Sequence, residues 1–160
     1  MKEVKIESTF KVYEDLSELP DDIQQLMQSA IETRENAYAP YSKFKVGAAI
    51  LLDNNEVIVG SNQENASYPS GLCAERTAIY YAGAKYPKAK ILKMAITASS
   101  QNQVTDSPIP PCGACRQSIS EYEIKQDQPI EIYFMGVKGK VVKSHSLANL
   151  LPLGFDRSFL

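Results

Sequence analysis

Three cysteines are the residues whose types and spacing could do chemistry. Cys73 stands alone in the chain, whereas Cys112 and Cys115 form a Cys-x-x-Cys pair. An odd number of cysteines argues against a disulfide framework and leaves metal binding or catalysis. A redox dithiol also uses the Cys-x-x-Cys spacing. The third cysteine favours a metal, because three protein ligands leave the fourth tetrahedral position of zinc to water.

An acidic residue close to the first cysteine strengthens the case for a catalytic metal. Glu75 lies two residues after Cys73, and a carboxylate that is not a ligand can take a proton from an activated water and pass it on. Arg76 follows Glu75, and Arg116 follows the last cysteine, so either could offset the negative charge of three thiolates around Zn²⁺. The alternative for both arginines is a solvent-facing salt bridge.

A structural zinc knot, or three buried thiols, is the alternative to a catalytic centre. A closed structural site normally needs four protein ligands. The single histidine, His145, lies far along the chain from the cysteines and is expected in a surface loop. Its position also argues against most Ser-His and Cys-His nucleophile schemes.

Hydrophobic spacing predicts the elements that must position these residues. Helices are expected over residues 21–37, 72–84 and 112–122, so both cysteine clusters open a helix, where free N–H groups stabilise thiolates. Strands are expected over residues 3–14, 45–52, 56–60, 91–98, 129–135 and 137–142. Helices interspersed among strands favour a layered α/β domain with a mixed sheet, whose sites lie where strands lead into helices.

Length and composition narrow the class of protein. The chain has 160 residues, 44% of them hydrophobic and 22% charged, which suits a single globular domain. The net charge of −2 and the dispersed lysines and arginines argue against a nucleic-acid partner. No apolar run approaches the ~20 residues of a spanning helix, and residues 1–7 lack the apolar core of a signal peptide. A cytoplasmic protein is expected.

Together, the motifs resemble those of the cytidine deaminase family. Cys73-Ala74-Glu75 with Pro111-Cys112-x-x-Cys115 is similar to the zinc-deaminase signature. Further blocks with the same resemblance cover residues 41–49, 62–69, 72–78, 111–117 and 150–152. The first ligand being a cysteine resembles the small homotetrameric branch of the family.

The resemblance implies a fold and an activity. The expected fold is a three-layer α/β/α domain with a mixed five-stranded sheet over residues 21–160, plus an N-terminal extension, residues 1–20, that forms an edge strand and linker. Cys73, Cys112 and Cys115 would hold one Zn²⁺ per chain. Glu75 would carry a proton from the zinc-bound water to ring N3 and then to the departing ammonia. Cytidine and 2′-deoxycytidine would become uridine and 2′-deoxyuridine, in pyrimidine salvage.

The resemblance also assigns substrate contacts. Asn62 and Glu64 would hydrogen-bond the ribose, chiefly its 3′-hydroxyl, while Phe44 would pack against the base and the backbone around Ala74 would read its edge. The alternatives are that Asn62 and Glu64 only shape a polar loop and that Phe44 is a core aromatic.

Three further assignments concern the assembly and the metal charge. Arg76 would ease the thiolate charge, and Tyr68 and Phe155 would reach the sites of neighbouring subunits in a homotetramer. Tyr68 could instead be a core aromatic, and Phe159 lies close enough in the chain to replace Phe155.

Two other functions compete with this reading. The first is a deaminase of the same fold that acts on a nucleoside antibiotic or on a base within RNA or DNA. The second is a zinc-stabilised binding protein without turnover. Glu75 argues against the second, because a purely structural site gives no reason for a carboxylate beside the metal.

Overall fold

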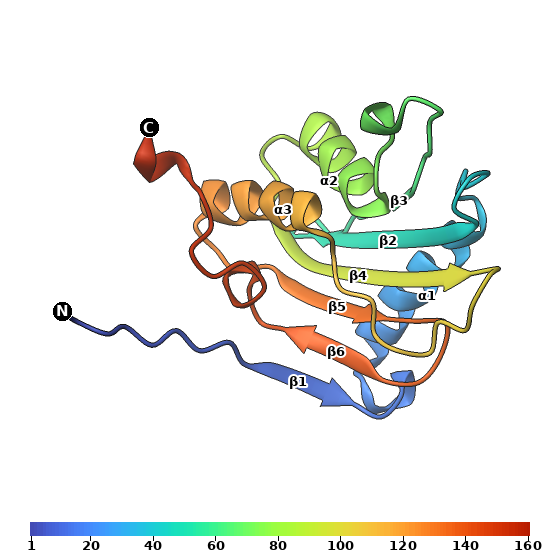
Figure 1. The fold of residues 1–160 in the computed structure, drawn as a ribbon, viewed down its shortest axis with the longest axis horizontal. Coiled ribbons are helices and arrows are strands. Elements are labelled where there is room, and N and C mark those ends of the chain that lie inside the picture. Colours follow the sequence, from blue (N-terminus) through green and yellow to red (C-terminus); the bar gives the residue numbers. More distant parts are fainter.

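A computed structural model describes residues 1–160 as a six-stranded sheet with helices on both faces (Figure 1). The strands are β1 (Phe10–Tyr13), β2 (Phe44–Leu52), β3 (Val57–Ser61), β4 (Ile91–Ser100), β5 (Glu131–Met135) and β6 (Val141–Ser144). The helices are α1 (Asp21–Glu35), α2 (Ala74–Lys85) and α3 (Gly113–Gln126). Helix α1 covers one face, and α2 and α3 cover the other. None of the helices is long and apolar enough to cross a membrane.

The sheet is mixed and has the strand order β1-β6-β5-β4-β2-β3. Only β4 and β5 are parallel; the other neighbours are antiparallel. This confirms the layered α/β class. The sheet has six strands instead of five because β1, from the N-terminal extension, joins the edge at β6.

Two strand predictions were wrong in their extent. Residues 3–14 alternate as a strand should, but only Phe10–Tyr13 is one, because β6 is four residues long and offers no partner beyond Ser144. The predicted strand over 137–142 begins only at Val141, because the preceding residues form a turn in which Gly139 has a φ of 84°. Positive φ is a conformation that glycine adopts without steric cost.

The core lies in two layers, one on each side of the sheet. One cluster of buried apolar residues joins the sheet to α2 and α3, and the other joins it to α1. The central residues of β2 and β4 are buried on both faces, which explains why these strands are mostly apolar and lack a strict alternation.

Close packing against glycines fixes the helices on the sheet. A Cβ on Gly60 of β3 would lie 2.6 Å from the backbone nitrogen of Ala78 and 2.7 Å from the carbonyl oxygen of Ala74. On the other face, a Cβ on Gly47 of β2 would lie 2.0 Å from the Ala30 carbonyl oxygen of α1. Because β3 carries no side chain at residue 60, the first turns of α2 lie directly on the strand.

Candidate metal centre and active site

Three cysteine sulfurs converge where α2 and α3 begin. Cys73 precedes the first residue of α2, Cys112 precedes the first residue of α3, and Cys115 lies in the first turn of α3. The Cys73 Sγ lies 3.8 Å from the Cys112 Sγ, which lies 3.5 Å from the Cys115 Sγ. All three sulfurs lie within 4.8 Å of one another. The sequence thus predicted correctly that residues separated by about 40 positions meet.

The sulfur triangle has the dimensions that zinc requires. A tetrahedral zinc with Zn–S bonds of about 2.3 Å holds its sulfurs about 3.8 Å apart. His145 is exposed and lies beside Glu131, its Nδ1 3.7 Å from a carboxylate oxygen, so it does not complete a fourth protein ligand. Three thiolates with the fourth position open are the donor set of a catalytic zinc site.

Glu75 lies on the first turn of α2, beside the sulfurs, and is only 4% exposed. Its burial raises the pKa of the carboxyl, and the negative charge of Cys73 raises the pKa further. A carboxyl group with a raised pKa holds a proton more readily, which suits a group that takes up a proton and returns it. Helix α2 therefore presents a buried carboxyl group directly beside the metal ligands.

Of the two candidate arginines, only Arg76 faces the sulfurs. Its guanidinium donates to the Cys73 Sγ at 3.6 Å. The Cys115 thiol and this guanidinium both hold the pKa of Cys73 below its usual value. The Arg116 guanidinium instead donates to the carbonyl oxygens of Pro111, at 2.8 Å, and Leu150, at 2.9 Å. Arg116 therefore anchors the C-terminal segment to α3.

A pocket of about 700 Å³ opens in front of Glu75. Its lining includes the predicted residues Phe44, Asn62, Glu64 and Tyr68 together with the metal ligands Cys73 and Cys112. The structure thus brings four of the sequence-predicted substrate and subunit residues to one cavity. Ala74 is fully buried at the first position of α2, where the backbone N–H groups have no partner within the helix.

Asn62 and Glu64 both support the pocket wall. The Asn62 side chain accepts from the Val46 N–H at 2.7 Å and donates to the Phe44 carbonyl at 2.9 Å. The Glu64 carboxylate accepts from the Tyr41 N–H at 2.9 Å and from the Ser42 hydroxyl. Partial burial acts to raise the pKa of Glu64, but the hydrogen bonds from Ser42 and Tyr41 hold it below the usual value.

Hydrogen-bonding capacity remains on both side chains. An amide nitrogen has two N–H donors, and a carboxylate has about four lone-pair sites. Asn62 uses one donor and Glu64 uses three acceptor contacts, two of them from the Ser42 backbone and hydroxyl. Each side chain can therefore shape the loop and still meet a ligand.

The two residues predicted to reach neighbouring subunits lie apart. Tyr68 is 78% exposed at the rim of the pocket, with its ring 6.4 Å from that of Tyr41. Phe155 is exposed in the C-terminal segment and stacks on Phe159 at 5.7 Å. Phe155 does not line the pocket of its own chain.

The family model for the cytidine and deoxycytidylate deaminase zinc-binding region matches residues 20–128. The chain belongs to this deaminase family. It is a zinc-dependent deaminase, and the three converging cysteines are consistent with one Zn²⁺.

Relatives agree over most of the chain. A cytidine deaminase of Halalkalibacterium halodurans is 40% identical over 84% of this deaminase and 94% of its own length. The crystal structure of a cytidine deaminase from Burkholderia pseudomallei has a TM-score of 0.70 and 38% identity, covering 82% of this chain and 97% of that one. A Mycobacterium tuberculosis cytidine deaminase structure has a TM-score of 0.66 and 31% identity, covering 86% and 99%.

Sequence reasoning did not identify several pocket residues. Leu72, Ile109 and Pro110 form part of the apolar wall of the deaminase pocket. Ile109 and Pro110 belong to the proline-containing loop between β4 and α3. Tyr41 and Ser42 lie in one of the blocks that resemble the family, but only the structure shows that they hydrogen-bond to Glu64.

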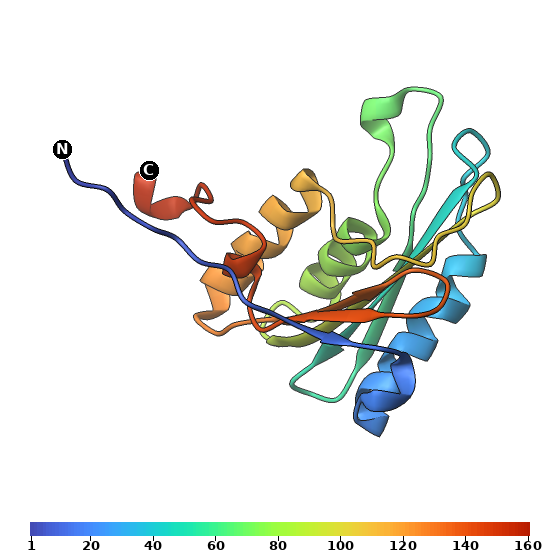
Figure 2. The same cartoon turned by 60° about the horizontal axis from the view of Figure 1, so that its bottom comes forward.

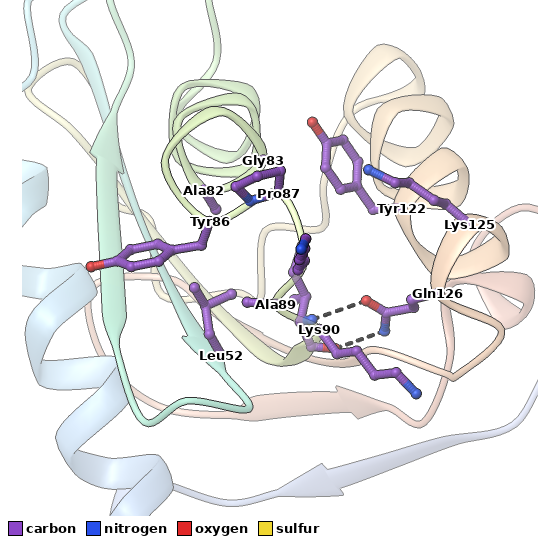
Figure 3. Close-up of a pocket in the computed structure, with 12 residues that line it drawn as sticks. Leu52, Ala82, Gly83, Tyr86, Pro87, Ala89, Lys90, Tyr122, Lys125 and Gln126 are labelled. Carbon is purple, nitrogen blue, oxygen red and sulfur yellow. Dashed lines mark hydrogen bonds between the residues drawn. The ribbon is translucent and has the colours of Figure 1, made fainter.

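A second, smaller pocket of about 250 Å³ lies at the opposite ends of the same helices (Figure 3). It is lined by residues from the C-terminal ends of α2 and α3, such as Tyr86 and Tyr122. The Gln126 side chain crosses its floor and bonds the backbone N–H and carbonyl of Ile91. None of the metal ligands lines this pocket.

Proposed function

We propose that this deaminase hydrolyses the 4-amino group of cytidine and 2′-deoxycytidine, giving uridine and 2′-deoxyuridine with release of ammonia. The observation that carries the proposal is the buried Glu75 beside three converging sulfurs at one pocket. The relatives named cytidine deaminase, which match over nearly their whole length, support the nucleoside substrate.

In this proposal Glu75 acts as the proton shuttle. Bound zinc supplies a Lewis acid that makes a water nucleophilic at neutral pH. Glu75 takes one proton from the attacking water and delivers it to ring N3, so that C4 becomes tetrahedral when its bond to oxygen forms. A second proton passes to the amino nitrogen, the C4–N bond breaks, and ammonia leaves. The two protons and the oxygen of one water balance the reaction.

Substrate positioning would come from the pocket wall. The free donor of Asn62 and the remaining lone pairs of Glu64 would meet the ribose 3′-hydroxyl. Phe44 would pack against the base, and the N–H groups that begin α2 at Ala74 would read its edge. Because these contacts address the 3′-hydroxyl, both the ribose and the 2′-deoxyribose forms should be accepted.

The proposal extends to the assembly and the cellular role. In a homotetramer, Tyr68 and Phe155 would reach the pockets of neighbouring subunits. The exposure of both rings supports an intermolecular contact. A cytoplasmic pyrimidine-salvage role follows from the proposed reaction and stays a prediction.

The first experiment is an absorbance assay of purified protein with cytidine, run with and without a strong zinc chelator. Turnover that disappears with the chelator and returns with added zinc supports the reaction and its metal dependence. Zinc-loaded protein that leaves cytidine and 2′-deoxycytidine unchanged would contradict the proposal. The same samples tested on a cytosine-containing nucleoside antibiotic and on single-stranded DNA would then separate another deaminase from a binding protein.

A further inference from the structure

The residues before β1 form an extended arm that has no partner within the chain. Residues 1–9 are all exposed, and the arm runs out from the edge of the sheet in both views (Figures 1 and 2). Pairing between β1 and β6 starts only at Phe10, opposite Ser144. Outside the strand ladders, no backbone hydrogen bond involves residues 1–9.

The arm has the side-chain pattern of a strand. Val4 is 73% exposed and Ile6 is 52% exposed, and both share the side of Phe10 in a period-two pattern. Glu3, Lys5 and Glu7 occupy the other side, where Lys5 and Glu7 form an ion pair. Unpaired N–H and C=O groups that continue an edge strand are a template for another strand.

We propose that this arm pairs antiparallel with the arm of a second copy of the chain, about a two-fold axis at Ile6. In this register Lys5 of each copy lies opposite Glu7 of the other, so two opposite-charge pairs form across the strands. Such pairs stabilise an antiparallel ladder, whereas like charges directly opposite destabilise it. The apolar side then brings the two Ile6 side chains together.

Other registers fit the charges or the length less well. An axis at Lys5 places the two Lys5 residues opposite each other, and an axis at Glu7 does the same for the two glutamates. An axis at Val4 pairs Glu3 with Lys5 but brings none of residues 1–9 opposite the partner's β1. The axis at Ile6 places Lys2 opposite Phe10 and Met1 opposite Lys11, so each arm reaches the free edge of the partner's β1. The sheets of two copies then become continuous.

The arm contact is independent of the proposed reaction and of the proposed tetramer. It uses residues of the N-terminal extension, whereas the reaction uses residues of α2, α3 and the pocket wall. The failure of either proposal therefore leaves the other standing.

Cysteine cross-linking of zinc-loaded protein tests the register. Residue 6 lies on the two-fold axis, so the Ile6→Cys side chains of the two copies face each other. This variant should give a disulfide-linked dimer on a non-reducing gel after mild oxidation. Val4→Cys is the matched control, because Val4 is an apolar residue on the same side of the arm and is more exposed than Ile6. In the proposed register the two Val4→Cys positions lie about four residues, or ~13 Å, apart along the strands. The expected result is loss of the dimer band in Val4→Cys and in the unmodified protein. No Ile6→Cys dimer, or equal dimer from both variants, would overturn the proposal.

Charge reversal provides a second, independent readout. Lys5→Glu or Glu7→Lys alone turns both cross-strand pairs repulsive and should weaken arm-mediated association roughly tenfold, measured as a dissociation constant by sedimentation. An equimolar mixture of the two variants restores both attractive pairs and should associate as a heterodimer. Lys138→Glu, in the exposed turn before β6, should have no effect. A mixture that associates no better than the single variants contradicts arm pairing.

Discussion

At Glu75 the position of the side chain, more than its type, sets the proposed chemistry. The carboxyl is buried beside the sulfurs because α2 begins at Ala74, directly after Cys73, which places the first turn of the helix against the metal ligands. The sequence predicted both the helix start and the proximity, because Cys73-Ala74-Glu75 permits little separation. What it could not give is the burial, which depends on the loop and strands around the pocket.

Removing the proposed proton shuttle should greatly lower turnover without removing zinc. Glu75→Gln keeps the shape of the side chain but cannot carry a proton, so kcat should fall by at least ~10²-fold, the scale of a general acid–base group. Metal analysis should still find one zinc per chain. Unchanged turnover in this variant would exclude Glu75 as the shuttle.

The two arginines should respond differently to truncation. Arg76→Ala removes the cation at the Cys73 sulfur, and we expect kcat to fall with little change in thermal stability. Arg116→Ala removes charge-assisted hydrogen bonds to Pro111 and Leu150, each worth ~1.5–3 kcal/mol, and should lower the melting temperature instead. Paired assays of kcat and Tm would separate the two; matching effects in both variants would contradict these assignments.

The family resemblance favoured Arg76 for this role, but helix spacing alone could not distinguish the two arginines. Residues three or four positions apart share a helix face, so Arg76 is placed toward Cys73 and Arg116 toward Cys112 by the same rule. In the structure only Arg76 donates to a sulfur, because the Arg116 guanidinium donates to the carbonyl oxygens of Pro111 and Leu150 instead. Leu150 lies 34 residues further along the chain, and such a contact leaves no local pattern.

At the scale of elements, the contact of α2 with β3 sets the depth of the active site. Gly60→Ala would place a Cβ 2.6 Å from the Ala78 nitrogen, so α2 must move away from the sheet. Overpacking of this kind costs ~1–3 kcal/mol, and the displaced helix should also reduce turnover. Gly113→Ala is the control, because a Cβ there meets nothing within 4 Å although it adjoins Cys112. Melting curves and kcat of both variants provide the measurement, and equal losses would refute the argument.

Strands β5 and β6 carry an acid-sensitive contact. Burial alone would raise the pKa of Glu131, but hydrogen bonds from Lys143 and Tyr133 hold it below its usual value. A lowered native pKa stabilises the fold above the unfolded value near 4.5 and loses that contribution as pH falls further. Glu131→Gln should therefore lower Tm by about 2–4 °C at pH 7 and flatten its decline below pH ~5. An unchanged acid slope would contradict this.

The ends of a strand could be predicted where they depend on the sequence of that strand alone. Strands β2 and β4 are apolar runs buried on both faces, and their predicted limits lie within two residues of the observed ones. Strand β1 was predicted too long because its length is set by β6, its only partner. The alternation in residues 3–9 is present, but a strand requires a neighbour as well as a pattern.

At the scale of the whole molecule, the proposed tetramer predicts complementation between defective chains. Phe155→Ala should lose activity because neighbouring sites lack its ring, while zinc is retained. In mixed assemblies with Glu75→Gln, a pocket with an intact Glu75 would receive Phe155 from the other chain, so part of the activity should return. Refolding the two inactive variants together and measuring kcat provides the test.

Phe159→Ala is the control for this experiment, since the two rings stack in one chain. Phe159→Ala should keep its activity without a partner. If kcat does not recover when Phe155→Ala is mixed with Glu75→Gln, each active site is formed by one subunit alone. Loss of activity in Phe159→Ala, with Phe155→Ala active, would assign the contact to the other phenylalanine.

The meeting of Cys73 with Cys112 also affects how the chain folds. The two residues are 39 positions apart, and the intervening chain holds α2, β4 and the long loop before α3. Zinc held by both ends joins them in the folded chain, and because the three sulfurs converge only there, the free energy of zinc binding adds to the stability of the fold. Loss of zinc should therefore lower the free energy of unfolding of this deaminase as well as remove the Lewis acid of the proposed reaction.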